Sequence, residues 1–218
     1  TPAAAAAFLE PRLRQLADPF VLPDMERAVA RLWQARERDE PVVVFGDYDV
    51  DGVTATALLL EVLRPLGWRV EAYLPHRLEE GYGLTLEAAA NCLCRYSARL
   101  ILAVDCGSGA QETIAWLRDR GVDVIVLDHH QITVSPPSAA AVVNPHLRRA
   151  EAGENGELCS VGLAFKLAHA LLKRGRELKQ PWVTQVDLRT TLDLVALGTI
   201  ADLAPVLGEN RILTKAGL

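Results

Sequence analysis

Three aspartates occur at alternate positions, Asp47, Asp49 and Asp51, soon after an apolar run at 42–45. Gly52 follows the last of them. At neutral pH, three ionised carboxylates this close together repel one another unless a cation lies between them. Oxygen ligands of this kind suit hard divalent ions such as Mg²⁺ or Mn²⁺. A polar turn with three solvated aspartates would give the same local pattern, so this stretch alone leaves both interpretations open.

Two further apolar runs end in polar residues in the same way. Asp105 follows the run at 100–104, and Asp128, His129 and His130 follow the run at 124–127. Ligands of open parallel sheets bind beyond the carboxyl ends of the strands. If these runs are neighbouring strands, their carboxylates and imidazoles are therefore expected at one edge of the sheet.

Asp202 ends the apolar segment 192–201 and could complete a ring of ligands if that segment packs at the sheet edge. Taken singly, Asp105 could cap a helix, Asp128 could begin a turn, and His129 could be a core histidine. Taken together, these polar groups match a two-metal centre, in which a shared carboxylate bridges ions about 3.5–4 Å apart. Asp105 stands alone between the two outer groups and is the best candidate for the bridge.

The chemistry expected of such a centre is metal-assisted hydrolysis of a phosphate ester or anhydride. Paired ions lower the pKa of a bridging water and withdraw charge from a phosphoryl group. Other hydrolytic and nucleotide-binding classes lack their signatures here. The chain has no G-x-x-x-x-G-K-[ST] phosphate loop, no serine nucleophile elbow, and no G-x-G-x-x-G after its first strand.

The segments that must position these residues alternate between strands and helices. Strands are predicted at 41–45, 69–74, 100–104, 122–127 and 140–143, and helices at 4–16, 24–38, 52–64, 85–95, 109–119, 160–174 and 183–197. This alternation predicts an α/β fold: a doubly wound, mainly parallel β-sheet with flanking helices and a C-terminal helical extension covering one edge. Residues 1–39 are predicted to be an N-terminal helical segment, and residues 40–218 the main domain.

Length and composition fit one large α/β domain of 218 residues. The net charge of −5 argues against broad electrostatic binding to nucleic acid, but a local site whose metals carry the positive charge remains compatible with it. No apolar run reaches the roughly 18–20 residues of a membrane span, and no signal peptide is visible. The chain begins with Thr1 rather than Met, so we expect a fragment of a longer, cytoplasmic protein.

Four cysteines are present, and only Cys92 and Cys94 are close in sequence. A C-x-C pair without a second cysteine or histidine pair is weak evidence for zinc. Reduced, buried thiols are the expected state of these residues.

Seven stretches occur in the order and spacing found in one family of hydrolases. The chain resembles the DHH phosphoesterases and, within them, the RecJ single-strand-specific exonucleases over about residues 40–218. The stretches that carry the resemblance are Gly46–Gly52, Pro75–Gly83, Val104–Gly107, Leu127–His130, Val143–Pro145, Val161–Lys166 and Leu194–Asp202.

The resemblance implies a two-ion centre holding Mn²⁺ or Mg²⁺. Its first ion would be held by Asp47, Asp49 and Asp105, and its second by Asp51, Asp105, His129 and Asp202. His130 would lie beside the scissile phosphate, and Asp128 would orient a histidine without binding an ion itself. The implied partner is single-stranded DNA, degraded from its 5′ end. From the resemblance we also expect that the family's C-terminal domain, which completes a groove for that strand, is not part of this sequence.

Three residues after the second predicted strand could contact the substrate: His76, Arg77 and Tyr82. Arg77 could clamp a phosphate with its planar guanidinium, and Tyr82 could stack on a base. A surface loop with a helix-capping role would explain the same residues. Two alternatives for the function also stay open: a DHH phosphodiesterase acting on short oligonucleotides or cyclic dinucleotides, and an inactive DHH-like scaffold in a replication complex.

Overall fold

One sheet of five parallel strands organises the chain, which the computed structural model describes over residues 8–132, 135–148 and 157–218. The strand order is β2-β1-β3-β4-β5. Its strands are β1 (Val42–Phe45), β2 (Val70–Tyr73), β3 (Leu100–Val104), β4 (Asp123–Leu127) and β5 (Ala141–Val143). All pairs are parallel, as predicted. The order reverses between β1 and β3, so the carboxyl ends of these two strands form the topological switch point where ligands bind in such sheets.

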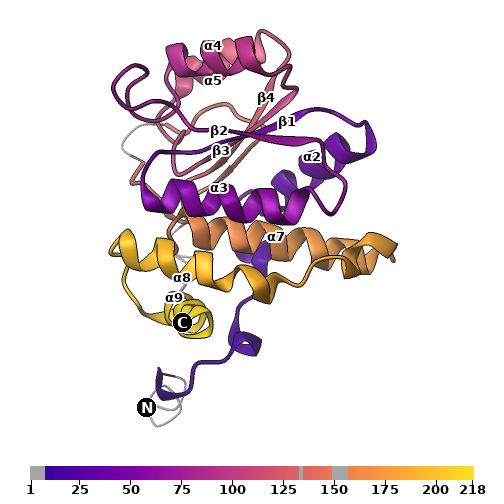
Figure 1. Ribbon diagram of the computed structural model, residues 1–218, viewed down its shortest axis with the longest axis vertical. Coiled ribbons are helices and arrows are strands. Elements are labelled where there is room, and N and C mark those ends of the chain that lie inside the picture. Colours follow the sequence, from indigo (N-terminus) through magenta and orange to yellow (C-terminus); the bar gives the residue numbers. More distant parts are fainter. Residues whose placement is uncertain (1–7, 133–134, 149–156) are drawn as a thin grey trace.

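Helices cover both faces of this sheet (Figure 1). On one face lie α4 (Leu86–Arg95) and α5 (Gln111–Arg118); on the other lie α2 (Met25–Glu37), α3 (Val50–Leu63) and α7 (Ser160–Glu177). Successive residues of the central strands enter opposite cores, and this two-sided burial explains why those strands are apolar throughout. The predicted doubly wound α/β architecture is confirmed.

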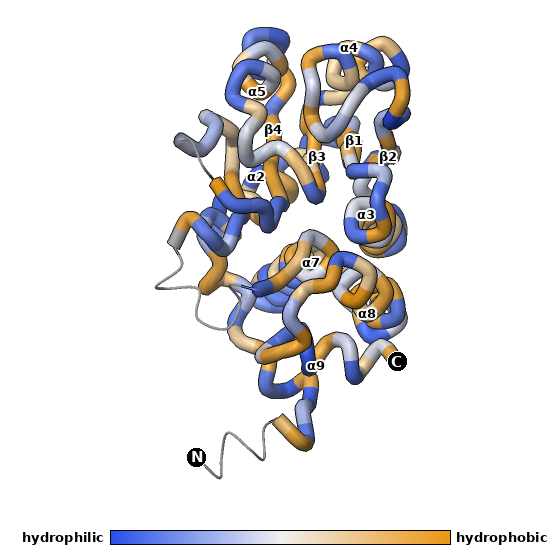
Figure 2. The backbone as a smooth tube through the Cα atoms, turned by 90° about the vertical axis from the view of Figure 1, so that its left-hand side faces the viewer, coloured by the Kyte–Doolittle hydropathy of each residue, from blue (hydrophilic) through white to orange (hydrophobic). Residues whose placement is uncertain are grey.

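A further pair of helices, α8 (Leu192–Ala201) and α9 (Gly208–Gly217), lies beneath α3 and α7 (Figure 1). Most of α8 is hydrophobic in Figure 2. Leu192 and Val195 are buried where α8 packs against α3, α7 and α9, whereas Leu197 and Ile200 are exposed. The C-terminal extension was expected to cover one edge of the sheet, and this is wrong. Instead α7 covers a face beside α3, and α8 packs on α3 rather than on the sheet.

Two predicted helices are only partly correct in their described residues. Only residues 8 and 9 and the 3-10 turn Leu13–Gln15 are helical in the segment predicted as 4–16, because Pro11 interrupts the helix. The segment predicted as 183–197 consists of two 3-10 turns, Pro181–Thr184 and Leu188–Thr191, before α8 begins. The Asp187 side chain accepts a hydrogen bond from Arg189 N and so caps the second turn locally.

The N-terminal part of the chain shares the core of the sheet. α2 packs against α7 and β5, and its residues Met25, Val29 and Leu32 are buried with those of α3 and α7. The division of the chain at residue 39 stays a prediction. Within the described residues no helix has the length and apolarity that a bilayer span requires.

One buried ion pair ties the N-terminal segment to both later helices. Lys166 on α7 is fully buried and donates to both carboxylate oxygens of Glu209 on α9, at 2.9 and 3.0 Å, and to the carbonyl of Ala17 at 2.8 Å. Ala17 N in turn donates to Glu209 at 2.6 Å. Each charge in this pair depends on the other, because an unpaired charge in such a position loses its hydration without compensation.

We therefore expect Lys166→Met to lower the free energy of unfolding by about 3–5 kcal/mol, since it leaves the Glu209 carboxylate buried without its cation. The double change Lys166→Met with Glu209→Gln removes both charges and should recover most of that loss. Urea unfolding followed by circular dichroism measures both values. Equal losses in the single and the double variant would show that the charge pairing is not the cause.

Candidate metal centre

The three aspartates after β1 are held in three different ways. Asp47 is fully buried and accepts a hydrogen bond from Tyr48 N at 2.6 Å. Asp49 is the N-cap of α3 and accepts from Gly52 N at 2.9 Å. Asp51 lies in the first turn of α3 and is 1 % exposed. A Cβ at position 52 would lie 2.6–2.8 Å from the backbone of Asp47, so only glycine allows α3 to start this close to β1.

The N-terminus of α7 faces this cluster. Ser160 N and Val161 N donate to the two oxygens of Asp51 at 2.6 and 2.8 Å. The Ser160 hydroxyl donates to Oδ1 of Asp105 at 3.0 Å. A helix N-terminus carries unpaired N–H groups and a partial positive charge, and here both stabilise carboxylates from two different elements, the first turn of α3 and the end of β3.

Asp105 directly follows β3 and occupies the centre of the cluster. It is 1 % exposed, and its φ of 62° places it in the left-handed region, which a residue with a Cβ seldom occupies. Nε2 of His129 lies 3.4 Å from Oδ1 of Asp105 and 3.8 Å from one oxygen each of Asp51 and Asp202. Carboxylates from the start of α3 and the ends of β3 and α8 therefore surround one imidazole that follows β4.

Asp202 reaches this group through a close helix contact. It ends α8, and its N–H donates to the carbonyl of Gly198 at 2.9 Å. A Cβ on Gly198 would lie 2.4 Å from Oγ1 of Thr54 on α3 and 2.7 Å from Cγ1 of Val161 on α7. The glycine thus lets α8 approach the two helices that carry Asp51 and its hydrogen-bond donors.

Burial makes the charged state of these carboxylates unfavourable. It raises the pKa of Asp47, Asp51 and Asp202, and it raises the pKa of Asp105 to about 7. Burial alone would lower the pKa of His129, but the adjoining Asp105, Asp51 and Asp202 outweigh it and raise that pKa. The protein groups on their own do not balance the negative charge that this cluster carries when it is ionised.

Three buried polar atoms of the cluster have no hydrogen-bond partner: Oδ2 of Asp47, Oδ2 of Asp105 and Nε2 of His129. Orphaned buried polar atoms are rare in folded proteins and point to a missing ligand. Two groups bring ligand atoms within 4.8 Å of one another: Asp105 with His129 and His130, and Asp51 with Cys159 and Asp202. Carboxylate oxygens with one or two imidazoles suit Mn²⁺ or Mg²⁺, so the residues present fit divalent ions.

Asp128 holds the second histidine. Its Oδ1 lies 2.7 Å from Nδ1 of His130 and accepts from His130 N at 3.0 Å, while Oδ2 accepts from Ser108 N at 3.0 Å. Burial would raise the pKa of Asp128, but these hydrogen bonds outweigh it and lower the pKa to about 2. The same contact raises the pKa of His130 to about 9. His130 is therefore a cation at neutral pH, with Nε2 directed away from Asp128.

The three residues predicted to bind substrate are not equally close to His130. The Tyr82 hydroxyl is 3.3 Å from Nε2 of His130, and the Tyr82 ring meets the Tyr48 ring edge-on at 6.0 Å. The Arg77 guanidinium lies over the Tyr48 ring at 5.0 Å. His76 is exposed, and its ring is 3.9 Å from Glu79, with no described contact to the centre.

Several residues at the centre were missed by the sequence reasoning. They are Tyr48, Ser108, Asn144, Cys159 and Ser160. Asn144 donates to the Ser108 hydroxyl and to the His130 carbonyl, both at 3.0 Å, and so braces the loop that carries the histidines. A serine just before an apolar helical run was a visible sign of a helix start. Nothing local in the sequence indicated that this helix start would face Asp51.

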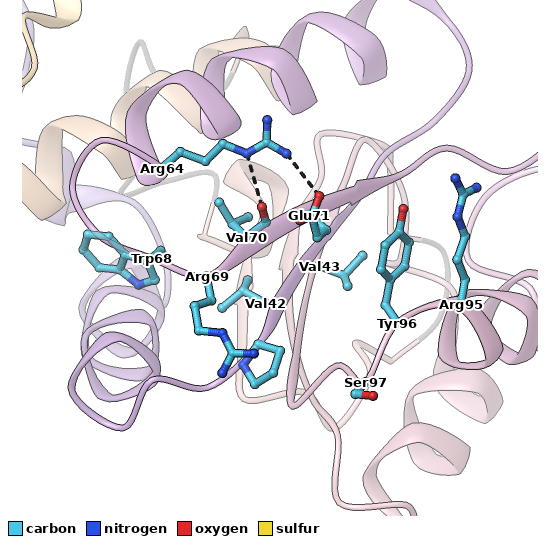
Figure 3. Close-up of a pocket in the computed structure, with 11 residues that line it drawn as sticks. Val42, Val43, Arg64, Trp68, Arg69, Val70, Glu71, Arg95, Tyr96 and Ser97 are labelled. Atoms are coloured by element: carbon cyan, nitrogen blue, oxygen red, sulfur yellow. Dashed lines mark hydrogen bonds and ion pairs between the residues drawn. The ribbon is translucent and has the colours of Figure 1, made fainter.

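A pocket of about 580 Å³ has a lining that includes none of the residues of the centre. Figure 3 shows the residues that line it. It lies at the amino ends of β1 and β2 and is lined by Arg64, Arg69 and Arg95 among others. Arg64 already pairs with Glu71 at 3.2 Å and Arg69 with Asp39 at 3.0 Å. The charges of two of its arginines are thus already paired. The pocket also lacks the carboxylate and imidazole cluster that the carboxyl ends of the strands provide.

Comparison with known proteins agrees with the geometry. A family model described as the DHH family, N-terminal domain, matches residues 41–199. The chain belongs to the DHH family. The matched region contains every aspartate and histidine of the centre except Asp202.

Relatives within the family are similar over nearly the whole chain. The single-stranded-DNA-specific exonuclease RecJ of Bacillus subtilis is 38 % identical over 100 % of this chain, which spans 26 % of that relative. The RecJ of Haemophilus influenzae is 39 % identical over 96 % of the chain, which spans 36 % of that relative. A crystal structure of exonuclease RecJ bound to manganese has a TM-score of 0.77 and 38 % identity, covering 93 % of this chain and 48 % of the other. The DHH chain described here is thus equivalent to a part of these longer proteins.

The contact between Asp128 and His130 makes a prediction for the metal-free DHH chain. We expect Asp128→Asn to move the pKa of His130 from about 9 towards the ordinary 6.5, because the carboxylate that stabilises the imidazolium is removed. Since the folded pKa is raised, this contact stabilises the fold below about pH 6.5 and is lost as pH rises through about 9. NMR titration of the imidazole gives both values. An unchanged pKa in Asp128→Asn would contradict the assignment.

The close approach at Gly198 makes a second prediction. Gly198→Ala should reduce the free energy of unfolding by about 1–3 kcal/mol and weaken Mn²⁺ binding, because its Cβ displaces α8 and with it Asp202. Gly109→Ala is the matched control, since a Cβ there meets nothing within 4 Å. Thermal unfolding and calorimetric titration with Mn²⁺ measure the two effects. Equal behaviour of the two variants would argue against this packing constraint.

Proposed function

We propose that this protein is a metal-dependent hydrolase that degrades single-stranded DNA from its 5′ end with two bound Mn²⁺ or Mg²⁺ ions. One observation carries the proposal: buried oxygens of Asp47 and Asp105 and Nε2 of His129 lack hydrogen-bond partners at the sheet's switch point. The DHH family match and the names of the RecJ relatives support the substrate and the reaction. The manganese in a similar RecJ structure supports the metal.

We assign the ligands to two groups that share Asp105. The first group is Asp47, Asp49 and Asp105, and the second is Asp51, Asp105, His129 and Asp202. The distances of 3.4–3.8 Å from His129 Nε2 to Asp51, Asp105 and Asp202 support the second group. Asp49 is close enough to Asp105 to raise its pKa, which supports the first. Such ions, when bound, supply Lewis acidity that activates water and neutralises charge on the phosphoryl group.

The chain's own residues would bind and orient the strand around that centre. Asp128 holds Nδ1 of His130 and so favours the protonated ring, which leaves Nε2–H free to donate to an oxygen of the scissile phosphate. Arg77 would hold a further phosphate with its guanidinium, and Tyr82 would support a base by stacking. His76, at the start of the same loop, would contact the backbone of the strand. Positive charge concentrated in this way allows a chain of net charge −5 to bind a polyanion.

The compartment proposed for this reaction is the cytoplasm. All four cysteines are free, and Cys92, Cys106 and Cys159 are buried thiols. Thiols without disulfide partners suit a reducing compartment.

Removing the shared carboxylate tests the function directly. We expect Asp105→Asn to lower Mn²⁺-dependent degradation of a 5′-labelled single strand by at least about 100-fold, because both ions lose a ligand. Asp119→Asn, which changes an exposed aspartate at the end of α5, is the matched control and should keep full activity. Calorimetric titration with Mn²⁺ should show weaker binding in Asp105→Asn alone.

The labels also decide among the alternatives. Release of labelled mononucleotide from the 5′ end, with none from a 3′ label at early times, supports the proposed polarity. Turnover of dinucleotides or cyclic dinucleotides with no loss of longer strands would instead indicate the short-substrate phosphodiesterase. Neither Mn²⁺ binding nor hydrolysis in the wild-type protein would indicate the inactive scaffold.

A further inference from the structure

The loop between β2 and α4 is folded around one carboxylate, that of Glu80. Its Oε1 accepts hydrogen bonds from the hydroxyl of Tyr73, at the end of β2, and from Nδ2 of Asn91, on α4, the latter at 2.8 Å. Its Oε2 accepts from His76 N, at the start of the loop, at 2.7 Å. Three donors from a strand, a loop and a helix thus meet on one side chain.

The main chain of the same residue closes the loop at both ends. Glu80 N donates to the carbonyl of His76 at 2.8 Å, and the Glu80 carbonyl accepts from Oγ1 of Thr85 at 3.1 Å. Thr85 is the N-cap of α4 and accepts from Ala88 N at 3.0 Å. The loop is therefore joined to the helix start and to the strand end by hydrogen bonds that all involve Glu80.

Two exposed residues of this loop face the metal centre. Arg77 lies over the ring of Tyr48, and Tyr82 contacts both Tyr48 and His130. Tyr48 itself stands between two of the aspartates after β1. The shape of the loop thus determines where Arg77 and Tyr82 stand relative to His130, while Glu80 itself touches none of these three residues in the described contacts.

We propose that Glu80 is a positioning residue for the substrate: its carboxylate holds the 76–85 loop in the shape that presents Arg77 and Tyr82 to the strand beside His130. The inference rests on the proposed function, because it assigns these two residues to substrate binding. It makes no use of the metal ligands, which come from other elements. Glu80 should consequently govern how well the strand is bound and leave ion binding unchanged.

A carboxylate suits this position and an amide does not. All three side-chain contacts of Glu80 are from donors, so both of its oxygens must accept. In the Glu80→Gln variant, one of the two acceptors becomes an NH₂ group facing either His76 N or the pair Tyr73 and Asn91. With the NH₂ group at His76 N, two donors would face each other. At the other end, the Tyr73 hydroxyl would have to turn to accept and the Asn91 amide would have to turn over. Either arrangement loses an acceptor that carries charge, so the hydrogen bonds that hold the loop are weakened. The Glu80→Gln change keeps the size of the side chain, so the test isolates the acceptor.

Steady-state kinetics on a 5′-phosphorylated single strand with saturating Mn²⁺ tests this role. We expect Glu80→Gln to raise KM by about 10-fold with kcat within about 2-fold of wild type, because misplaced binding groups weaken capture of the strand. Tyr73→Phe removes one of three donors without altering the carboxylate and should raise KM by less. Glu79→Gln makes the same chemical change one residue earlier, on a largely exposed side chain, and should leave KM unchanged.

Two further measurements separate positioning from a general effect on the fold. Hydrogen exchange at the His76 amide should quicken in Glu80→Gln, and Mn²⁺ affinity should stay within about 2-fold of wild type. An unchanged KM, an equal rise in Glu79→Gln, or a parallel loss of Mn²⁺ affinity would each overturn the proposal. If the wild-type protein does not degrade single strands, the proposed function fails. Binding of the same labelled strand, which Glu80→Gln should still weaken, then decides the role of Glu80.

Discussion

The burial of several carboxylates at one point is the constraint on which the rest of this structure depends. Asp47, Asp51 and Asp105 are each at most 1 % exposed, yet they lie within one cluster at the switch point between β1 and β3. An ionised carboxylate that is removed from water loses its hydration, which costs roughly several kcal/mol unless hydrogen-bond donors or cations replace the water. The fold has to supply those partners, and each neighbouring element can be understood by the part it contributes.

The N-terminus of α7 supplies the largest share that comes from the protein itself. Two of its backbone N–H groups and the Ser160 hydroxyl reach Asp51 and Asp105, so the helix must begin where those two side chains end. This requirement explains why α7 lies on the face beside α3 rather than at the sheet's edge. It leaves Oδ2 of Asp47 and Oδ2 of Asp105 without donors, and cations are the remaining means of balancing them.

Local and regular features of this chain could be predicted from its sequence. The central strands β1 and β3 are continuous apolar runs followed closely by aspartates, so their parallel pairing and the meeting of Asp105 with His129 at one edge of the sheet could be predicted from topology. Two of the errors were local: Pro11 and the Asp187 cap end helical runs that periodicity alone would continue. The third came from tertiary contacts, because the position of α8 depends on Gly198 meeting α3. Contacts of this kind, and the donors at Ser160, involve residues too distant in sequence for any pattern to reveal.

The two histidines of the Asp-His-His stretch are adjacent in sequence but differ in their surroundings. His129 faces three carboxylates and has no partner for Nε2, so it is available to a metal ion. His130 has its Nδ1 held by Asp128, so its charge is retained at neutral pH and its free nitrogen faces Tyr82. The surroundings of the two side chains therefore suit different ligands. On one side the groups are carboxylates that require cations; on the other they are cations and aromatic rings that suit phosphates and bases.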